Sequence, residues 1–272
     1  MNEIDWNAAF DNMGSVAGSA QLPGQWQAAA EAFRAETPGI ETDIPYGDAP
    51  RQRFDLIHPE GPASGLVVFV HGGYWMRLEK GFWTHLARGA RAHGWAVAMP
   101  SYTLAPQARI SAITREIAAA IAAAAARVAG RVRITGHSAG GHLVARMACA
   151  DSPLPGDVQE RVARIVSISG LHDLHPLMRT RMNDVLQLDD AEAQAESPAL
   201  LPPLAATRVS AWAGGAELPE FRRQARLLAE SWQGRNGETS CHIAQGRNHF
   251  TILDDFADPD GPILRDLLGD QG

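Results

Sequence analysis

The chain has 272 residues, of which 45% are hydrophobic and 20% charged, a balance typical of a soluble globular protein. Its net charge of −7 argues against a nucleic-acid partner and against binding to anionic membranes. Its length suits one large domain over residues 1–272, and no apolar run is long enough to cross a membrane.

The N-terminus and the cysteines favour a cytoplasmic protein. Residues 1–6 are acidic and lack the basic and apolar regions of a secretory signal. Cys149 and Cys241 fall in a helical and a strand-like stretch, so buried free thiols are expected. No Cys or His cluster has metal-ligand spacing, and no metal or other cofactor is expected. A homodimer is compatible with the sequence, which does not define the oligomeric state.

Residues 1–36 are expected to be helical, because apolar side chains recur at roughly helical spacing between glycine and proline breaks. This lead-in suits either a lid over a pocket or a strap on the outside of the core, and the sequence does not choose between them. Short strand-like runs follow at 40–44 and 52–57.

An uninterrupted apolar run at 65–70 is typical of a strand buried on both faces of a parallel sheet. The later expected elements are helices at 81–93, 110–128 and 219–232, and strands at 95–100, 132–135, 164–169, 209–213 and 240–244. Strands that alternate with helices predict an α/β fold with one open, mostly parallel sheet. Ile113, Ile117 and Ile121 recur every fourth residue and predict a packing ridge. The irregular segment 171–203 is expected to be an insertion that covers the site.

The sequence Gly-His-Ser-Ala-Gly at 136–140 lies between a strand-like run and a helix-compatible stretch. Strand, G-x-S-x-G and helix together indicate a nucleophile elbow, a sharp turn that exposes the serine hydroxyl at the carboxyl edge of the sheet. The dipole of the helix that follows favours a developing negative charge there. Ser138 is therefore the candidate nucleophile. Alone, the pentapeptide also fits a plain turn with a buried serine.

The acid and the base are expected after the serine along the chain. Glu217 lies in the loop after the strand at 209–213 and is the candidate acid, although a carboxylate also suits the start of the next helix. Glu220 and Asp184 are alternative carboxylates. Among the ten histidines, only His249 falls on a loop after the last strand, which makes it the candidate base.

A His-Gly-Gly sequence at 71–73 follows the strand at 65–70, where an oxyanion loop belongs. Glycine lets the backbone N–H groups of Gly72 and Gly73 approach a substrate oxygen, and Ala139 next to the serine supplies another N–H. His71 is expected to brace this loop rather than to transfer protons. The alternative is a glycine turn that only closes the strand.

These motifs resemble the α/β-hydrolase superfamily, in particular its hormone-sensitive-lipase-like esterases, whose H-G-G and N-Y-R-L-A-P motifs are similar to residues 71–73 and 101–106. The H-G-G-Y-W sequence at 71–75 is more similar to arylformamidases, also called kynurenine formamidases. The segments 169–177 and 217–224 also resemble formamidase segments. The resemblance covers about residues 40–257. Glu217 departs from the aspartate that is commoner in the superfamily.

The resemblance implies an acyl-enzyme mechanism. Ser138 would attack a formyl or small acyl carbonyl, His249 would take its proton, and Glu217 would orient His249. The amides named above would bind the oxyanion. The substrate pocket is expected to include Tyr74, Trp75 and His172. Core packing is the alternative for Trp75, and a solvated or packing role is the favoured alternative for His172.

Two hydrolase functions fit these residues and share the same catalytic groups. The first is a formamidase that acts on an aryl formamide, and the second is a carboxylesterase that acts on short acyl esters. A third hypothesis, a small-molecule receptor without catalysis, is disfavoured because Ser138, Glu217 and His249 are all present.

Overall fold

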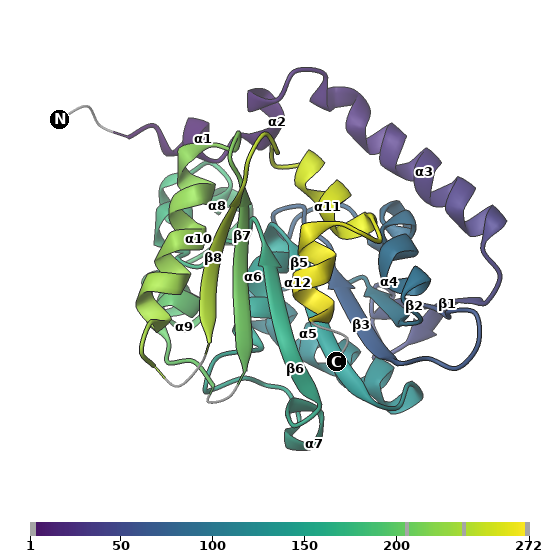
Figure 1. Ribbon diagram of the computed structural model, residues 1–272. Helices are drawn as coiled ribbons and strands as arrows, with labels where there is room; N and C mark the ends of the chain where they lie inside the picture. The colour runs from purple at the N-terminus through teal and green to yellow at the C-terminus, as the bar shows by residue number, and fades with distance from the viewer. Residues whose placement is uncertain (1–3, 205–206, 236–237, 270–272) are drawn as a thin grey trace.

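The computed structural model describes residues 4–204, 207–235 and 238–269. Within these ranges the strands form one eight-stranded sheet in the order β1-β2-β4-β3-β5-β6-β7-β8 (Figure 1). The strands are β1 (Ile40–Pro45), β2 (Arg53–Ile57), β3 (Gly65–Val70), β4 (Ala96–Pro100), β5 (Arg131–His137), β6 (Val162–Ile168), β7 (Arg208–Gly214) and β8 (Thr239–Ala244). β2 pairs antiparallel with β1 and β4, and the other pairs are parallel. The predicted α/β fold with a mostly parallel sheet is confirmed.

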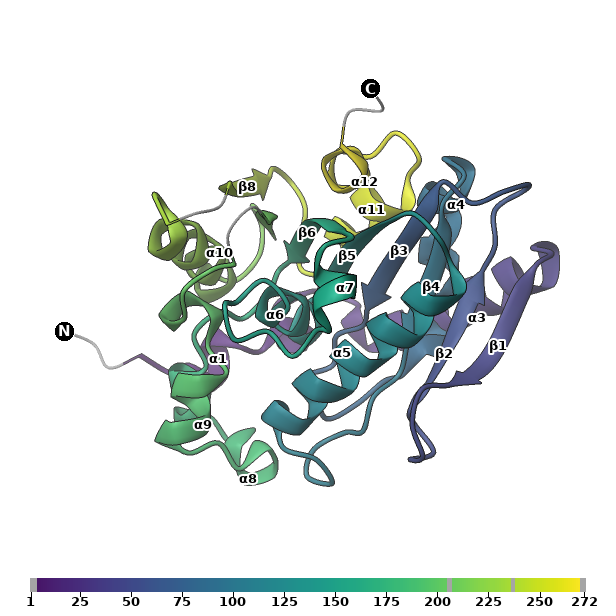
Figure 2. The same ribbon diagram turned by 90° about the horizontal axis from the view of Figure 1, so that it is seen from below.

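Helices cover both faces of this sheet (Figure 2). They are α1 (Trp6–Ala9), α2 (Asn12–Ser15), α3 (Leu22–Glu36), α4 (Arg88–Ala92), α5 (Ile110–Arg127), α6 (Ala139–Arg146), α7 (Gly156–Gln159), α8 (Asn183–Leu186), α9 (Asp190–Ala195), α10 (Pro219–Trp232), α11 (Asp254–Ala257) and α12 (Pro262–Leu268). None of the helices in the described ranges is long and apolar enough to cross a bilayer.

Two buried apolar clusters, one on each face, hold the layers together. Leu66 and Val68 of β3 point to the cluster under α5, α6 and α10, whereas Val67 and Phe69 point to the cluster under α4, α11 and α12. This alternation is the pleat of a strand buried on both sides, as the apolar run predicts. The core therefore extends through the sheet and supports the loops at its carboxyl edge.

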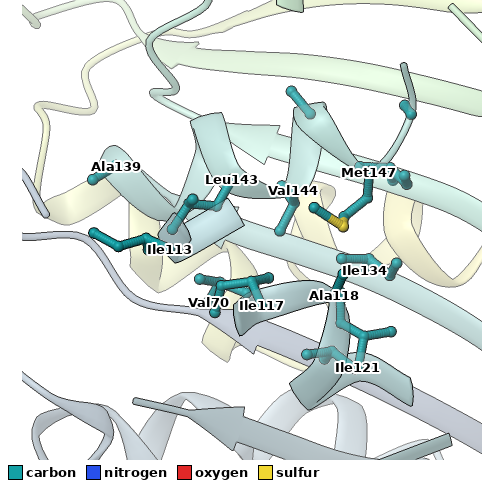
Figure 3. Close-up of a cluster of buried hydrophobic side chains, with 14 of the residues drawn as sticks. Val70, Ile113, Ile117, Ala118, Ile121, Ile134, Ala139, Leu143, Val144 and Met147 are labelled. Atoms are coloured by element: carbon teal, nitrogen blue, oxygen red, sulfur yellow. The ribbon is translucent and has the colours of Figure 1, made fainter. Parts of the chain in front are cut away.

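The ridge on α5 packs as the fourfold spacing predicts. Ile113, Ile117 and Ile121 are fully buried, and Figure 3 shows them close to side chains of the sheet and of α6. The alanines between them let the helix approach the sheet closely. This ridge thus connects the helix to β3 and β5, the strands that lead into the His-Gly-Gly and Gly-His-Ser motifs.

The helix expected at 81–93 is instead divided. Two 3-10 turns, η2 (Lys80–Phe82) and η3 (Thr84–Ala87), precede the short helix α4. Arg34 of α3 donates to the Gly81 carbonyl oxygen at 2.7 Å and to Thr84 Oγ1 at 2.8 Å. The helix is interrupted for two reasons. The Gly81 carbonyl oxygen accepts a hydrogen bond from Arg34, and glycine has a low helix propensity.

The segment 171–203 is built from η4 (His175–Arg179), α8, α9 and η5 (Pro198–Leu200). It does not lie loosely over the sheet, because Leu171, Leu174 and Leu177 are fully buried and join the core cluster of α5 and α6. Its position in the fold is therefore maintained by apolar packing.

Replacing Ile117 by alanine tests the ridge. Because the side chain is fully buried, the Ile117→Ala variant should lose about 2–5 kcal/mol of unfolding free energy. Urea unfolding followed by circular dichroism measures this loss. The exposed Arg115 on the same helix gives the control, since Arg115→Ala should change stability by no more than about 0.5 kcal/mol. Equal losses for the two variants would contradict the proposed packing.

Candidate active site

Ser138 lies at a sharp turn between β5 and α6. Its backbone has φ 55° and ψ −119°, a conformation that costs a non-glycine residue roughly 1–3 kcal/mol. The turn is held by a hydrogen bond from the Ser138 amide to the Ile168 carbonyl oxygen, 2.8 Å long. Gly136 and Gly140 flank it, and a Cβ on Gly140 would overlap the Val70 carbonyl oxygen. The strand, strained turn and helix are those that the motif predicts.

Glu217 and His249 form a buried pair. Glu217 Oε2 lies 2.8 Å from His249 Nδ1, and both residues are about 95% buried or more. A carboxylate only accepts hydrogen bonds, so Nδ1 carries the proton and Nε2 is left as the acceptor of the ring. The structure thus brings together the acid and base candidates although 32 positions separate them.

The alternative carboxylates are placed elsewhere. Glu220 accepts from Arg223 Nε at 2.7 Å and from Gln224 Nε2 at 2.9 Å, and Asp184 is exposed on α8. Neither hydrogen-bonds to His249 within the described ranges. Glu217 is therefore the carboxylate that this geometry offers to the imidazole.

The second oxygen of Glu217 is held by donors that the sequence motifs did not indicate. Glu217 Oε1 accepts from Ser169 Oγ at 2.6 Å and from the Gly214 amide at 2.5 Å. Ser169 follows β6 and has φ 52°, an uncommon conformation for serine. The sequence indicates Ser169 only as part of the formamidase-like segment 169–177. The role of its side chain becomes visible in the structure, where β6 and β7 lie side by side.

Ser138 and His249 line the same cavity, which has a volume of about 530 Å³. The described residues show no hydrogen bond between the two side chains, and such contacts are often long in an unliganded site. The His249 ring is fixed from two sides, with its centroid 4.6 Å from Phe221 and 4.6 Å from His137. Burial holds the pKa of His137 well below its usual range, so this neighbour stays neutral.

The glycine loop after β3 runs beside the elbow. A Cβ on Gly72 would lie 3.0 Å from the Cβ of Ser138 and 2.9 Å from the His137 carbonyl oxygen, so only glycine allows this approach. Gly73 has φ 115°, which also favours glycine. Among the described residues, the amides of Gly72, Gly73 and Ala139 donate to no protein acceptor. They are thus free to bind an oxygen at this place.

His71 packs as a brace for this loop. Its Nδ1 donates to the Gly72 carbonyl oxygen at 2.7 Å, and its ring stacks on Tyr102 with centroids 4.4 Å apart. The Tyr102 hydroxyl donates to the His71 carbonyl oxygen at 3.0 Å. Burial lowers the pKa of His71 to about 4, which keeps the ring neutral near pH 7.

The three expected pocket residues separate into two groups. Tyr74 lines the cavity, whereas Trp75 and His172 are fully buried away from its wall. Trp75 packs edge-to-face on His142 in the core, with centroids 5.1 Å apart. This placement corrects the pocket expectation for Trp75 and agrees with its core-packing alternative, since the large apolar indole is fully buried in the core cluster under α5 and α6.

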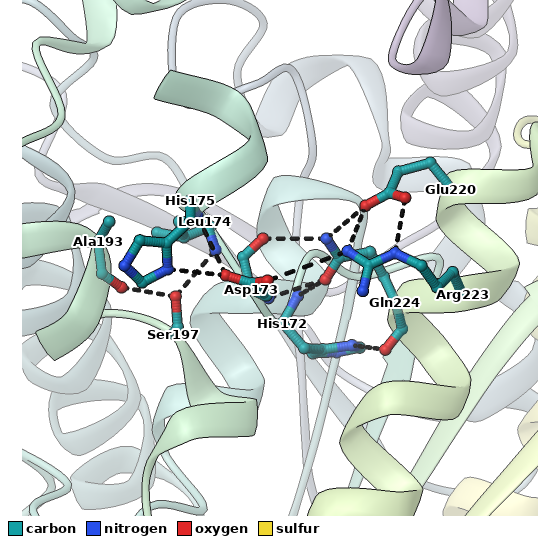
Figure 4. A network of polar contacts seen from close by, with 9 residues as sticks. All are labelled: His172, Asp173, Leu174, His175, Ala193, Ser197, Glu220, Arg223 and Gln224. Atoms are coloured by element: carbon teal, nitrogen blue, oxygen red, sulfur yellow. Dashed lines mark hydrogen bonds and ion pairs between the residues drawn. The ribbon is translucent and has the colours of Figure 1, made fainter. Parts of the chain in front are cut away.

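The placement of His172 corrects the expectation that this residue contacts substrate. Its Nδ1 lies 2.9 Å from the Gln224 carbonyl oxygen and its Nε2 lies 2.9 Å from Ser167 Oγ. Gln224 Oε1 in turn accepts from the amides of His172 and Asp173 at 2.7 and 2.8 Å (Figure 4). The network attaches the start of segment 171–203 to α10, the helix that follows Glu217.

The N-terminal lead-in supplies much of the cavity wall. Figure 1 shows α1, α2 and α3 in purple along the top of the molecule. The lining residues from this lead-in are Asn7, Ala8, Phe10, Asp11, Asn12, Met13, Pro23 and Trp26. The C-terminal part of α3 instead packs against η2 and η3 through Arg34. The lead-in therefore covers the cavity with its first half and straps the core with its second.

The remaining walls include aromatic rings that the sequence motifs do not indicate. Trp26 lies 4.7 Å from Trp83 and 5.6 Å from Phe250, between ring centroids, and all three line the cavity. From segment 171–203, only Arg181 and Met182 reach it. In the described ranges no group of three or more His, Cys, Asp or Glu side chains is arranged to hold a metal ion.

A family model described as the α/β hydrolase fold matches residues 67–253, more than half of the chain. The chain belongs to the α/β-hydrolase family. This finding confirms the resemblance that the motifs indicate, and the protein is a hydrolytic enzyme.

The kynurenine formamidase of Danio rerio is 26% identical over 236 residues, covering 83% of this hydrolase and 80% of the relative. The kynurenine formamidase of Drosophila melanogaster is 24% identical over 248 residues, covering 85% of this hydrolase and 82% of the relative.

Solved structures agree with this family. A protein from Silicibacter sp. TM1040, provisionally named a thioesterase, is 42% identical with a TM-score of 0.93, covering 98% of this hydrolase and 100% of that chain. An esterase from Pyrobaculum calidifontis is 19% identical with a TM-score of 0.68, covering 86% of each chain. The esterase likeness shows the fold alone.

Removal of the Ser169 hydroxyl tests its support of Glu217. Because hydrogen bonds to charged groups contribute about 1.5–3 kcal/mol, Ser169→Ala should lower the unfolding free energy by about that amount and reduce kcat/KM for 4-nitrophenyl acetate several-fold. Urea unfolding and initial rates measure the two effects. Ser240→Ala, on β8 away from the cavity, is the matched control and should change neither by much. An unfolding free energy and a kcat/KM equal to those of the wild type would show that the Ser169 hydroxyl does not support Glu217.

Buried neutral histidines predict acid sensitivity. Burial lowers the pKa of His71, His142 and His172 to about 4, 3 and 4, below the unfolded value near 6.5. Between these values the unfolded chain binds protons that the folded chain does not, so stability falls as pH decreases below about 6.5. At pH 5 each contributes a loss of roughly 2 kcal/mol.

Urea unfolding at pH 7.5 and pH 5 measures this loss. His172→Gln should show a smaller drop between the two pH values than the wild type, whatever its stability at pH 7.5. The exposed His93 gives the control, because His93→Gln should keep the wild-type drop. An unchanged drop in His172→Gln would show that this histidine does not cause the acid sensitivity.

Proposed function

We propose that this hydrolase removes a formyl or other small acyl group from an aryl amide, as an arylformamidase. The observation that carries the proposal is the buried Glu217–His249 pair, whose histidine lines the same aromatic-walled cavity as Ser138. The kynurenine formamidases, matched over more than four fifths of the chain, support an aryl formamide as the substrate class.

In the proposed reaction, Ser138 Oγ attacks the acyl carbon and His249 Nε2 takes the hydroxyl proton. Glu217 stabilises the imidazolium that forms and keeps the ring in the tautomer described above. The negative charge on the carbonyl oxygen is bound by the amides of Ala139 and of Gly72 or Gly73. One such donor typically contributes about 3 kcal/mol of transition-state stabilisation.

The tetrahedral intermediate then collapses with breakage of the carbon–nitrogen bond. His249 returns its proton to the leaving nitrogen, and an aryl amine departs while the acyl group stays on Ser138. Water attacks this acyl-enzyme, with His249 as the base, and releases the acid and the free hydroxyl. Delocalisation of the nitrogen lone pair into the ring makes an anilide leave more readily than an alkyl amide.

The cavity walls support an aromatic leaving group. Trp26, Trp83 and Phe250 form a set of adjacent rings, and rings of this kind bind a planar aryl group through offset or edge-to-face contacts. A volume of about 530 Å³ is within the range of small-molecule sites. The proposed substrate is therefore a small aryl amide rather than a polymer.

A carboxylesterase or thioesterase acting on short acyl groups is the second candidate. The same serine, histidine and carboxylate would cleave an ester. The oxygen or sulfur leaving group of such a substrate depends less on protonation by a general acid than an amide nitrogen does. The Silicibacter protein, 42% identical, with its provisional thioesterase name favours this candidate. The two functions differ in the group that leaves and not in the nucleophile.

The cellular setting is part of the same proposal. Cys149 is buried and Cys241 is partly buried, and both are free thiols in the structure. Free thiols suit a reducing compartment, so we place the enzyme in the cytoplasm.

A substrate comparison tests the proposed function. The value of kcat/KM for N-formylkynurenine should exceed that for 4-nitrophenyl acetate and for a short acyl thioester. Ser138→Ala and His249→Ala should each reduce turnover about a thousandfold or more, because both groups act in every step. Ser64→Ala, an exposed serine before β3, should keep wild-type rates.

Two results would contradict the proposal in different ways. Turnover of esters or thioesters with none of the formamide would favour the second candidate. Full activity in Ser138→Ala, with unchanged circular dichroism, would remove Ser138 from the mechanism.

A further inference from the structure

The hydroxyl of Tyr74 connects the glycine loop to the N-terminal lead-in. Tyr74 directly follows Gly73, whose amide is a proposed oxyanion donor, and it lines the cavity. Its hydroxyl donates to the Phe10 carbonyl oxygen at 2.5 Å and accepts from Asn12 Nδ2 at 3.1 Å. These partners lie 64 and 62 positions away along the chain, so the contact joins two separate segments.

The backbone of the loop is strained at Tyr74. Tyr74 and Trp75 have φ 52° and 57°, in the left-handed region that residues with a Cβ seldom adopt. Such conformations persist only where the surrounding structure holds them. The Gly73 carbonyl oxygen accepts from the amides of Met76 and Arg77 at 3.0 and 3.1 Å, which closes the turn. Trp75 is then held by its burial in the core, and Tyr74 by its hydroxyl.

The two halves of the glycine loop are held by different parts of the chain. The first half is braced from the core, because Tyr102 donates to the His71 carbonyl oxygen and His71 donates to that of Gly72. On the half that contains Gly73 and Tyr74, the side-chain hydrogen bonds within the described ranges come from the lead-in. The geometry of this half therefore depends on the docked lead-in.

Phe10 also reaches the side of the cavity that carries the base. Its exposed fraction is 2%, and its ring packs edge-to-face on Phe221 with centroids 6.0 Å apart. The Phe221 ring in turn lies 4.6 Å from the His249 ring, between centroids. A single residue of the lead-in is thus one neighbour away from both the glycine loop and the imidazole.

We infer that Tyr74 is a positioning residue for the oxyanion donors. By binding the Phe10 carbonyl oxygen, its hydroxyl fixes the Gly73 amide in place, so the docked lead-in sets the geometry of catalysis as well as the wall of the cavity. This inference rests on the proposed acyl-transfer function. The substrate carbonyl oxygen becomes negatively charged both when the acyl-enzyme forms and when water cleaves it. A displaced donor therefore slows both steps, whichever of them limits kcat.

Removal of the Tyr74 hydroxyl tests this role. Tyr74→Phe keeps the ring on the cavity wall and removes the hydrogen bonds to the lead-in. With 4-nitrophenyl acetate, kcat and kcat/KM should fall together by at least about fivefold, the fold-change that corresponds to one net hydrogen bond. The Ki of phenylboronic acid should rise by a similar factor, because its tetrahedral adduct with Ser138 places an oxygen at the same amides.

Tyr46→Phe is the matched control. The Tyr46 hydroxyl donates to the Ser101 carbonyl oxygen at 2.6 Å, and Tyr46 is not among the described residues that line the cavity. This variant also loses a phenol-to-carbonyl hydrogen bond, so its unfolding free energy in urea should fall about as much as that of Tyr74→Phe. Its kcat and its Ki should nevertheless stay at the wild-type values.

These measurements separate positioning from substrate contact and from a general loss of stability. Wild-type kcat and Ki in Tyr74→Phe would overturn the inference. A rise in KM with kcat unchanged would also overturn it, because that pattern indicates a contact to the bound substrate. An equal fall of kcat in Tyr46→Phe would trace the effect to stability alone. A wild-type enzyme that phenylboronic acid does not inhibit, together with full activity in Ser138→Ala, would instead refute the proposed function itself.

Discussion

The close approach of three backbone segments at the carboxyl edge of β3 and β5 is the constraint on which the site depends. A Cβ on Gly140 would overlap the Val70 carbonyl oxygen, and a Cβ on Gly72 would lie 3.0 Å from that of Ser138. Only glycine permits this spacing, and the spacing is what puts a hydroxyl and free amides on one cavity wall. The packing of β5 and α6 in the core offsets the cost of the strained φ of Ser138.

The parallel sheet then determines where the other groups arrive. In a parallel sheet the carboxyl ends of neighbouring strands meet at one edge, so the loops after β6, β7 and β8 all reach the region of Ser138. They bring Ser169, Glu217 and His249. These residues form a chain of hydrogen bonds that runs from the Ser169 hydroxyl through the Glu217 carboxylate to the His249 imidazole. The apolar packing of α10 on the sheet supports this chain from below, since Phe221 contacts the imidazole ring.

Features that depend on local sequence could be predicted, whereas features that depend on tertiary contacts could not. The strand and turn around Ser138 follow from glycine sterics and apolar runs, and the order of acid and base follows from the strand order. Trp75 shows the limit, because nothing local decides which of two adjacent aromatic side chains faces the cavity. Ser169 and Trp26 show it too, since their partners lie in segments 48 or more positions away.

The N-terminal lead-in gives the cavity a character that the sheet alone would not. It contributes aromatic rings to the wall, and its Phe10 carbonyl oxygen accepts a hydrogen bond from the Tyr74 hydroxyl. Tyr74 has φ 52° and adjoins Gly73, so the geometry of the glycine loop and the position of the lead-in depend on one another. A chain that changed its first helices would therefore alter the geometry of the glycine loop as well as the shape of the cavity. The N-terminal wall of the cavity and the glycine loop are in this way linked through the hydroxyl of Tyr74.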